Sequence, residues 1–318
     1  MRMPDTLPLP TDTPPGMPGP PGGGPNGSGP YNGAGQPSPP VALDGMNLGR
    51  DKLPEWTPAV WARIDQAATC EIDRASVAAQ FLPKVPSLTP SVRTVPANSI
   101  AGEGELNIDQ TKVLPLMEES QLFFLSKEQY YEEEAIGTAA NLAWRAANRL
   151  ARAMDMAIFQ GKKDHENPSL VSVAADQKTF TVYPLKPPVP GAVYGENLFT
   201  AVAAAYGHLQ GKNLYGPYAL VLPPEKYADA HAPLPTTLIM PADRIRPLMT
   251  AGFYASGTLP PNQGVMVSLG GTVDVAIAVH GATAFTKVES DETRRFRIYE
   301  RFTVRIKVPE SLVLLAFK

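Results

Sequence analysis

EQYYEEEAIGTAANLAWRAANRLARAMDMAIF, residues 128–159, carries the strongest helical signal in the chain. Apolar residues recur in it at steps of three and four, which places them on one helix face: Leu142, Ala146, Leu150, Ala153, Met154, Ala157 and Ile158. Its alanines favour helix, and Gly161 is suited to end it. At about 1.5 Å per residue such a helix would span roughly 48 Å, which is long for a compact domain. We therefore expect it to be bent, or frayed near Gly137.

Three shorter helices are predicted on either side of this segment. The first, residues 58–77, has a favourable start, because Thr57 is a good cap residue and Pro58 suits the first helical position. The other two are residues 196–210 and residues 224–231. The first helix also carries an apolar stripe, formed by Trp61, Ile64, Ala68, Ile72 and Ala75.

Strand patterns occupy much of the remaining chain. They are residues 113–125, 218–222, 265–269, 273–279, 296–307 and 312–317. The pair Gly270-Gly271 lies between two of these segments and predicts a hairpin turn. Helices and strands are interspersed without regular βαβ units, so the sequence predicts a mixed α+β fold.

Two segments are poor in large apolar residues. Residues 1–40 hold 13 prolines and 9 glycines, and such a composition cannot bury enough surface to offset the entropy of ordering. They are predicted to form a disordered tail, and the folded part is expected to begin near Met46. Residues 91–111 are rich in turn formers and are predicted to form a long exposed hairpin or loop.

Composition argues against several classes of function. The 318 residues carry a net charge of −3, which gives no sign of a nucleic-acid or membrane partner. No stretch of about 18 apolar residues is present, so no membrane span is expected. Prolines interrupt the place where a signal peptide would have its apolar core. Cys70 is the only cysteine, which excludes an intrachain disulfide and fits a cytoplasmic location.

Candidate catalytic and metal-binding groups are few. Asp164-His165-Glu166 has no second histidine nearby, so a solvated loop is preferred over a metal site. Cys70 lacks a clear base and is interpreted as a small packed residue rather than a nucleophile. The scattered histidines, such as His280, are interpreted as structural or exposed. We therefore expect no enzyme activity, no catalytic residue, no metal and no cofactor.

Five segments, in order along the chain, resemble the encapsulin family, also known as linocin-type proteins. Tyr215 to Leu222, YGPYALVL, is the most specific of them. Residues 77–80, VAAQ, depart from the family's Gly/Ala-Arg-Arg type segment, and the proline-rich tail is additional. The other four are Leu48-Gly49-Arg50-Asp51 with the helix WARIDQAA, Leu114 to Glu118 with Phe124-Leu125, Asp155 to Gly161, and Glu300 to Leu315.

The resemblance implies a Hong Kong 97 phage-type capsid fold of the α+β class. Such a fold has a peripheral domain that carries the long spine helix, an axial domain near the symmetry axes, and an extended loop that reaches a neighbouring subunit. The expected division is a disordered extension at 1–45, an arm helix at 46–85, an extended loop and adjoining strand at 86–125, the peripheral domain with the spine helix at 126–195, the axial domain at 196–272, and return strands of the peripheral domain at 273–318.

The same resemblance implies a shell subunit that assembles with copies of itself into an icosahedral nanocompartment in the cytoplasm. The enclosed cargo would be a peroxidase or a ferritin-like iron-storage enzyme, held through a short targeting peptide. The alternative within the same fold is a prophage major capsid protein, which would package DNA. Because the arm of the family faces the lumen, the tail is expected inside the shell, where a plain spacer is preferred over a competitor for cargo.

Two sets of binding residues follow from the resemblance. Cargo is expected in an apolar groove between the arm helix and a nearby strand, lined by Trp61, Ile64, Ala68, Ile72, Ala284 and Phe285. The alternative for this set is that it packs the arm against the shell body. The loop between subunits is expected within residues 95–108, with contributions from Val95, Asn98, Ile100, Gly102, Gly104, Leu106 and Ile108.

A basic stripe on the predicted strand 296–307 and the residues just before it allows a further interpretation. It contains Arg294, Arg295, Arg297, Arg301 and Arg305. Nucleic acid could bind there, but alternation along a strand makes the stripe one solvent or interface face of a sheet. Ion pairs with acidic residues across subunit boundaries are preferred over nucleic-acid binding.

Overall fold

The computed structural model describes residues 46, 48–85, 88–101, 107–162, 167–176, 183–185, 195–233 and 238–317. The chain divides into two units, Met1–Gln36 and Pro37–Lys318, and every described residue belongs to the second. Residues 1–45, which are predicted to be disordered, lie outside the described residues. Met46, near which the folded part is expected to begin, is the first described residue. Also outside the described residues are Gly102, Gly104, Leu106 and the Asp164-His165-Glu166 segment.

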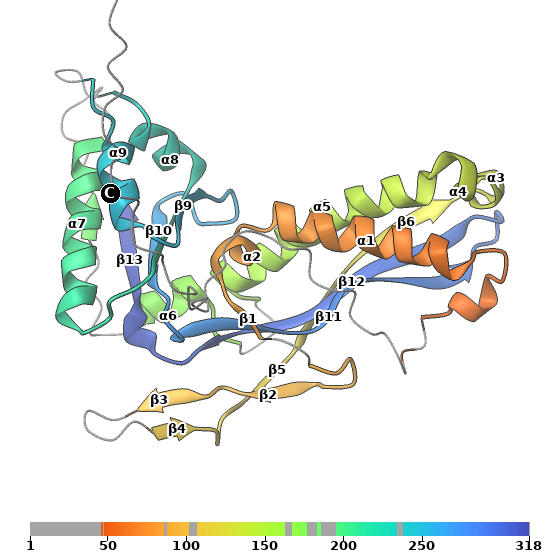
Figure 1. The fold of residues 1–318 in the computed structure, drawn as a ribbon, viewed down its shortest axis with the longest axis horizontal. Coiled ribbons are helices and arrows are strands. Elements are labelled where there is room, and N and C mark those ends of the chain that lie inside the picture. The colour runs from red at the N-terminus through yellow and green to blue at the C-terminus, as the bar shows by residue number, and fades with distance from the viewer. Residues whose placement is uncertain are drawn as a thin grey trace, which may run out of the picture. The chain divides into compact units, whose positions relative to one another are not determined.

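A four-stranded sheet has the strand order β1-β11-β12-β6. Two long helices, α1 (Pro58–Ala75) and α5 (Thr138–Gln160), pack along one of its faces (Figure 1). The opposite face carries no helix among the described residues. The strands are β1 (Lys84–Val85), β11 (Val273–Val288), β12 (Arg294–Ile306) and β6 (Met117–Leu125).

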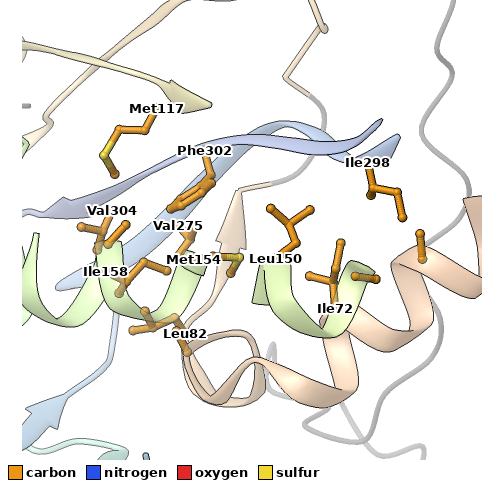
Figure 2. Close-up of a cluster of buried hydrophobic side chains, with 14 of the residues drawn as sticks. Ile72, Leu82, Met117, Leu150, Met154, Ile158, Val275, Ile298, Phe302 and Val304 are labelled. Atoms are coloured by element: carbon orange, nitrogen blue, oxygen red, sulfur yellow. The ribbon is translucent and has the colours of Figure 1, made fainter. Parts of the chain in front are cut away.

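The main core lies between these helices and the sheet. Figure 2 shows Leu150, Met154 and Ile158 of α5 directed toward Phe302 of β12, with Ile72 of α1 nearby. All five side chains are fully buried. Burying a side chain of this size stabilises a fold by about 1.5–3 kcal/mol, so the apolar face predicted for the long helix is its core face.

The predicted helix 128–159 is divided into three, and one division lies at Gly137, near which a bend or fraying was expected. Gly137 has a φ of 73°, a left-handed conformation that ends α4 and precedes α5. Ser126 starts the first piece with a capping box completed by Gln129. The two short pieces are α3 (Lys127–Tyr131) and α4 (Glu133–Ile136).

The prediction of one arm helix over residues 58–77 was wrong at its end. Ser76 is extended, and its hydroxyl accepts a hydrogen bond from the amide of Ala79, so it caps a second helix, α2 (Val77–Phe81). Val77 therefore belongs to α2 and not to α1. Within an apolar helical pattern a serine can be either a helix cap or an interior residue. The pattern alone favoured an interior position for Ser76.

A five-stranded sheet has the order β7-β13-β10-β8-β9. One face joins the main core, and the other forms a second core with three helices. Helix α6 (Leu170–Asp176) packs against β10, β13 and α5. The strands are β7 (Tyr183–Leu185), β8 (Tyr218–Leu222), β9 (Gly252–Ala255), β10 (Gln263–Ser268) and β13 (Leu312–Phe317), and the three helices are α7 (Gly195–Gly211), α8 (Pro224–Ala230) and α9 (Pro241–Ile245). Short 3₁₀ turns are η1 (Arg50–Lys52), η2 (Arg246–Leu248) and η3 (Pro309–Ser311).

The hairpin predicted at Gly270-Gly271 was wrong. β10 pairs with β8 and β13, whereas β11 pairs with β12 and β1, so the two strands lie in different sheets. Both glycines have positive φ, as a hairpin turn would need. A Cβ on Gly270 would lie 2.9 Å from the carbonyl oxygen of Gly216, so this turn instead packs closely on the loop before β8.

Residues 94–115 form a long excursion from the body. Two short antiparallel pairs build it: β2 (Thr94–Pro96) with β5 (Val113–Pro115), and β3 (Ser99–Ala101) with β4 (Asn107–Asp109). The predicted single strand 113–125 is thus two strands, because β5 belongs to the excursion and β6 to the four-stranded sheet. Figure 1 shows the excursion extending away from the sheet.

Candidate assembly and cargo surfaces

The arm is fastened to the sheet by Arg50. Its guanidinium binds the carboxylate of Asp65 at 2.7 Å and the carbonyl of Thr283 at 2.8 Å, and it lies over the ring of Trp61. Gly49 makes this approach possible, because its φ is 65° and a Cβ there would lie 2.6 Å from the carbonyl oxygen of Phe285. The Leu48-Gly49-Arg50-Asp51 segment therefore anchors the arm.

The six residues predicted to bind cargo are buried within the chain. None exposes more than 8% of its surface. Trp61, Ile64, Ala68 and Ile72 pack in the main core, where Phe285 also lies. Ala284 packs on the opposite sheet face with Leu48 and Tyr299, apart from the other five. Their burial favours the alternative in which they pack the arm against the body, and direct cargo contact by these six stays a prediction.

An aromatic stack joins the start of the arm to the sheet. Trp56 stacks on Tyr130 at 5.0 Å and on Phe296 at 5.1 Å, and Phe296 stacks on Phe123 at 5.1 Å. The indole N–H of Trp56 donates to the carbonyl of Tyr130. Sequence reasoning missed this stack, because its members come from four separate segments.

A group of buried charges links α1 to the sheet, and sequence reasoning missed it as well. His280 on β11 places Nδ1 3.0 Å from Glu300 on β12 and Nε2 3.0 Å from Asp73 on α1. Asp73 also binds Lys84 of β1. Burial lowers the pKa of His280, but the carboxylates of Glu300 and Asp73 outweigh burial and raise it to about 9. His280 is therefore a protonated, structural histidine.

The residues predicted for the loop between subunits divide into a packed base and an open end. Val95 is buried against Leu114 and Ala276 at the base. Asn98 has a positive φ of 56°, and the Ile100 amide donates to the carbonyl of Lys307. Ile108 is 56% exposed. A pocket of about 240 Å³ lies where the base meets the body, lined by Ala97, Ser99, Lys112, Leu114, Pro168, Val173, Ile306 and Pro309.

Four of the five arginines of the basic stripe form ion pairs within the chain, and ion pairs of the stripe across subunits stay a prediction. Arg297 and Arg301 both bind Glu118, at 3.0 and 2.6 Å. Arg305 binds Asp274 at 2.7 Å. Acidic residues on the neighbouring strands occupy the same sheet face, which the spacing of the arginines alone did not reveal. Arg301 and Arg305 are also buried, so neither is free for nucleic acid.

Metal sites and membrane spans are both absent from the described residues. Within those ranges, no group of three or more histidine, cysteine or carboxylate residues is arranged to hold a metal ion. No helix in the same part of the chain is long and apolar enough to cross a bilayer.

Comparison with known sequences identifies a family. The family model described as "Encapsulating protein for peroxidase" matches residues 46–303. A curated relative, "Type 1 encapsulin shell protein EncA" of Myxococcus xanthus (strain DK1622), is 32% identical over 118 residues. That match covers 37% of this chain and 41% of the relative, so it spans less than half of the relative's length.

Comparison with solved structures shows the fold. The virus-like particle from Pyrococcus furiosus superposes with a TM-score of 0.61 at 13% identity, covering 80% of this chain and 98% of that one. Mycobacterium phage Bobi gives a TM-score of 0.55 at 15% identity, covering 77% and 91%. At these identities the likeness concerns the fold alone. It confirms the expected α+β capsid fold of the Hong Kong 97 phage type.

Proposed function

The chain belongs to the encapsulin family, and from this membership we propose that it is the structural subunit of a closed protein shell that encloses a cargo protein. The observation that carries the proposal is the family match over residues 46–303, which spans nearly all of the described fold. The capsid fold supports it, because a shell needs one subunit to repeat the same contacts many times. The proposed role is structural rather than catalytic, in the cytoplasm. Cys70 is exposed, so its interpretation as a packed residue was wrong, and in that compartment its thiol would stay reduced.

The excursion of residues 94–115 supports assembly on physical grounds. Its outer pair, β3 with β4, has three residues in each strand, and isolated two-stranded ribbons are marginal in water. Ile108 and Val113 are more than half exposed. A neighbouring subunit that covers these side chains would complete the packing, so the excursion is proposed as the loop between subunits.

Particle formation is the direct test. The purified protein, run on a size-exclusion column and viewed by negative-stain electron microscopy, is expected to give hollow particles of megadalton size. Mass spectrometry of the particles should identify the proteins that co-purify. A well-folded single subunit that never assembles at any concentration would overturn the proposal.

A phage-capsid role is the alternative that the fold permits. Particles of that kind would carry DNA, so they would absorb more strongly at 260 nm than at 280 nm and would lose that absorbance with their nucleic acid. Arg297, Arg301 and Arg305 of β12 bind carboxylates of the same chain, which favours a protein cargo. Particles that retain nuclease-protected DNA would support the alternative.

Cargo is proposed to dock along α1, with the buried residues beneath the groove holding the helix in place. Two substitutions on α1 separate direct contact from packing. Ala62 is exposed, whereas Ile64, on the other side of the same helix, is fully buried. Ala62→Asp is expected to lower cargo content and leave particles intact, whereas Ile64→Asp should lower particle yield itself, because it buries an unpaired charge. Co-purified cargo per particle is the measurement, and wild-type loading in Ala62→Asp particles would contradict docking on this face.

A further inference from the structure

The outer side of α1 and α5 carries exposed arginines and, within these two helices, no exposed carboxylate. Both helices pack on the four-stranded sheet through their apolar faces, so their other sides point away from it (Figure 1). Their four carboxylates are buried or half-buried, and each is bound within the chain. Every exposed charged residue on the two helices is an arginine: Arg63, Arg74, Arg145, Arg149 and Arg152. Because the whole chain has a net charge of −3, this is a basic surface on an acidic protein.

Three of these arginines have no partner in the described part of the chain. Arg145, Arg149 and Arg152 follow one another along α5 at steps of four and three, which places them on one side of the helix. None of the three forms an ion pair with a described residue, whereas Arg63 and Arg74 each bind a carboxylate. We call Arg145, Arg149 and Arg152 the α5 arginines. They present three uncompensated positive charges within about 10.5 Å of helix.

Large apolar side chains adjoin the α5 arginines. Met156 follows Arg152 by four residues on the same side of α5 and is 44% exposed. Trp144 is 39% exposed, and the guanidinium groups of Arg74 and Arg145 lie over its ring at 5.9 and 5.8 Å.

The composition of this surface favours a protein partner. Tryptophan, methionine and arginine are enriched at protein–protein interfaces, whereas lysine, aspartate and glutamate are depleted there. No lysine lies on α1 or α5. A surface for nucleic acid has no such preference, because lysine neutralises phosphates as arginine does. The uncompensated positive charge then requires carboxylates on the partner.

We propose that the α5 arginines bind a carboxylate-rich segment of the enclosed cargo protein, with apolar side chains of that segment on Trp144 and Met156. The inference rests on the proposed function, because docking along α1 places the outer side of the neighbouring α5 in the lumen as well. It adds a second contact to the one on α1.

The spacing of the arginines suits an extended segment. Every second side chain of an extended chain faces the same way, and two such side chains are about 6.6 Å apart. Arg145 and Arg149 are separated by about 6 Å along the helix axis. Carboxylates at alternate positions of the partner therefore meet successive arginines.

Reporter loading in particles of the full-length protein tests the contact. A monomeric fluorescent protein is co-expressed with the tail Leu-Glu-Ser-Glu-Ser-Glu-Leu at its C-terminus, and a matched reporter carries glutamine in place of the three glutamates. Reporter per particle should be at least about fivefold higher for the acidic tail, because three exposed ion pairs form together. The triple variant Arg145→Gln, Arg149→Gln, Arg152→Gln should bring the acidic reporter down to the level of the glutamine reporter, since glutamine preserves the helix and removes the charge.

A second triple variant removes the same charge elsewhere. Lys52→Gln, Arg93→Gln and Lys212→Gln change exposed cations outside α1 and α5, so loading of the acidic reporter should stay at the wild-type level. Equal loading of the two reporters by the wild type, or an equal loss in both triple variants, would overturn the proposal. If no particles form, fluorescein-labelled tail peptides are titrated onto the subunit by anisotropy. Failure of the shell is thus told apart from failure of the contact, for which equal binding of the two peptides is decisive.

Nucleic acid is the competing occupant of this surface. It would raise the absorbance of wild-type particles at 260 nm relative to 280 nm, and the α5 triple variant would lower that ratio. A lowered ratio together with unchanged loading of the acidic reporter would overturn the proposal in favour of nucleic acid. An unchanged ratio with lost reporter loading is the result expected for a protein partner.

Discussion

His280 shows how one side chain can hold two elements together through charge. It is 8% exposed, and it faces Glu300 from β12 and Asp73 from α1, and Lys84 of β1 binds the same carboxylate oxygen of Asp73. Asp155 of α5 is the next charge, close enough to Glu300 for its pKa to be affected. With His280 protonated, the two carboxylates nearest to it are balanced by two cations.

Stability should therefore fall at alkaline pH. The pKa of His280 is raised from 6.5 to about 9 in the fold, so its contribution is complete below pH 6.5 and is lost as the pH rises through 9. A shift of this size corresponds to roughly 3 kcal/mol of unfolding free energy. Thermal unfolding at fixed protein concentration between pH 6 and 10 should show the loss, and His280→Gln should flatten it.

The control for this measurement is His208→Gln on α7, which lies in the other core region and should keep the alkaline loss. A wild-type curve that is flat up to pH 10 would show that His280 is neutral in the fold. If the His280→Gln variant lost the same amount of stability at alkaline pH, the loss would come from the titration of another group.

At the scale of elements, Asp155 shows how a residue of one helix can define another. Its carboxylate accepts hydrogen bonds from the hydroxyl of Ser76 at 2.7 Å and from the amides of Val77 and Ala78 at 2.8 and 3.0 Å. It thereby holds the first turn of α2 from the side of α5. Burial raises the pKa of Asp155 to about 6 despite these hydrogen bonds.

Replacing Asp155 should loosen α2 more than any other helix. Asp155→Ala leaves a buried hydroxyl and two amides without their acceptor, at a cost of about 2–4 kcal/mol. Asp155→Asn keeps one acceptor and removes the buried charge, so it should cost less. Hydrogen exchange of residues 76–82 is the measurement, with α7 as the internal reference, and equal protection in wild type and Asp155→Ala would contradict the capping role.

Sequence patterns were informative for elements whose signal is local. The apolar face of α5 was predicted from helix periodicity, and a bend or fraying near Gly137 was predicted from the length of the helix. The break at Ser76 was missed, because what makes Ser76 a cap is Asp155, 79 residues away. The false hairpin at Gly270-Gly271 has the same origin, since the partners of β10 and β11 are set by strands distant in sequence.

The candidate site was less predictable than the fold for a related reason. The resemblance located the arm helix and its neighbouring strand, but side chains on an apolar stripe are the same residue types whether they face a core or a ligand. Ile64 and Ala68 are fully buried. The pairing of the β12 arginines was likewise hidden, because Glu118 and Asp274 lie far from them in sequence.

At the scale of the whole molecule, the two cores and the excursion have separate tasks. The described residues of 98–111 belong to neither main core, and Asn98 and Gln110 approach closely enough for their side chains to share a hydrogen bond of 3.1 Å. The ends of the outer pair can therefore be joined by a short turn. The fold should survive removal of the outer pair, and only contacts between subunits should be lost.

Replacing residues 99–109 with Gly-Gly tests this separation. The variant keeps β2 paired with β5, so its circular dichroism and thermal unfolding should stay close to those of an unassembled wild-type subunit, while electron microscopy shows no closed particles. Deleting residues 1–40 is the matched control, because it removes a longer polar segment and should leave particles intact. Normal particles without residues 99–109 would show that subunits join elsewhere. An unfolded variant would show instead that the contact between the Ile100 amide and Lys307 supports the body of the fold as well as its assembly.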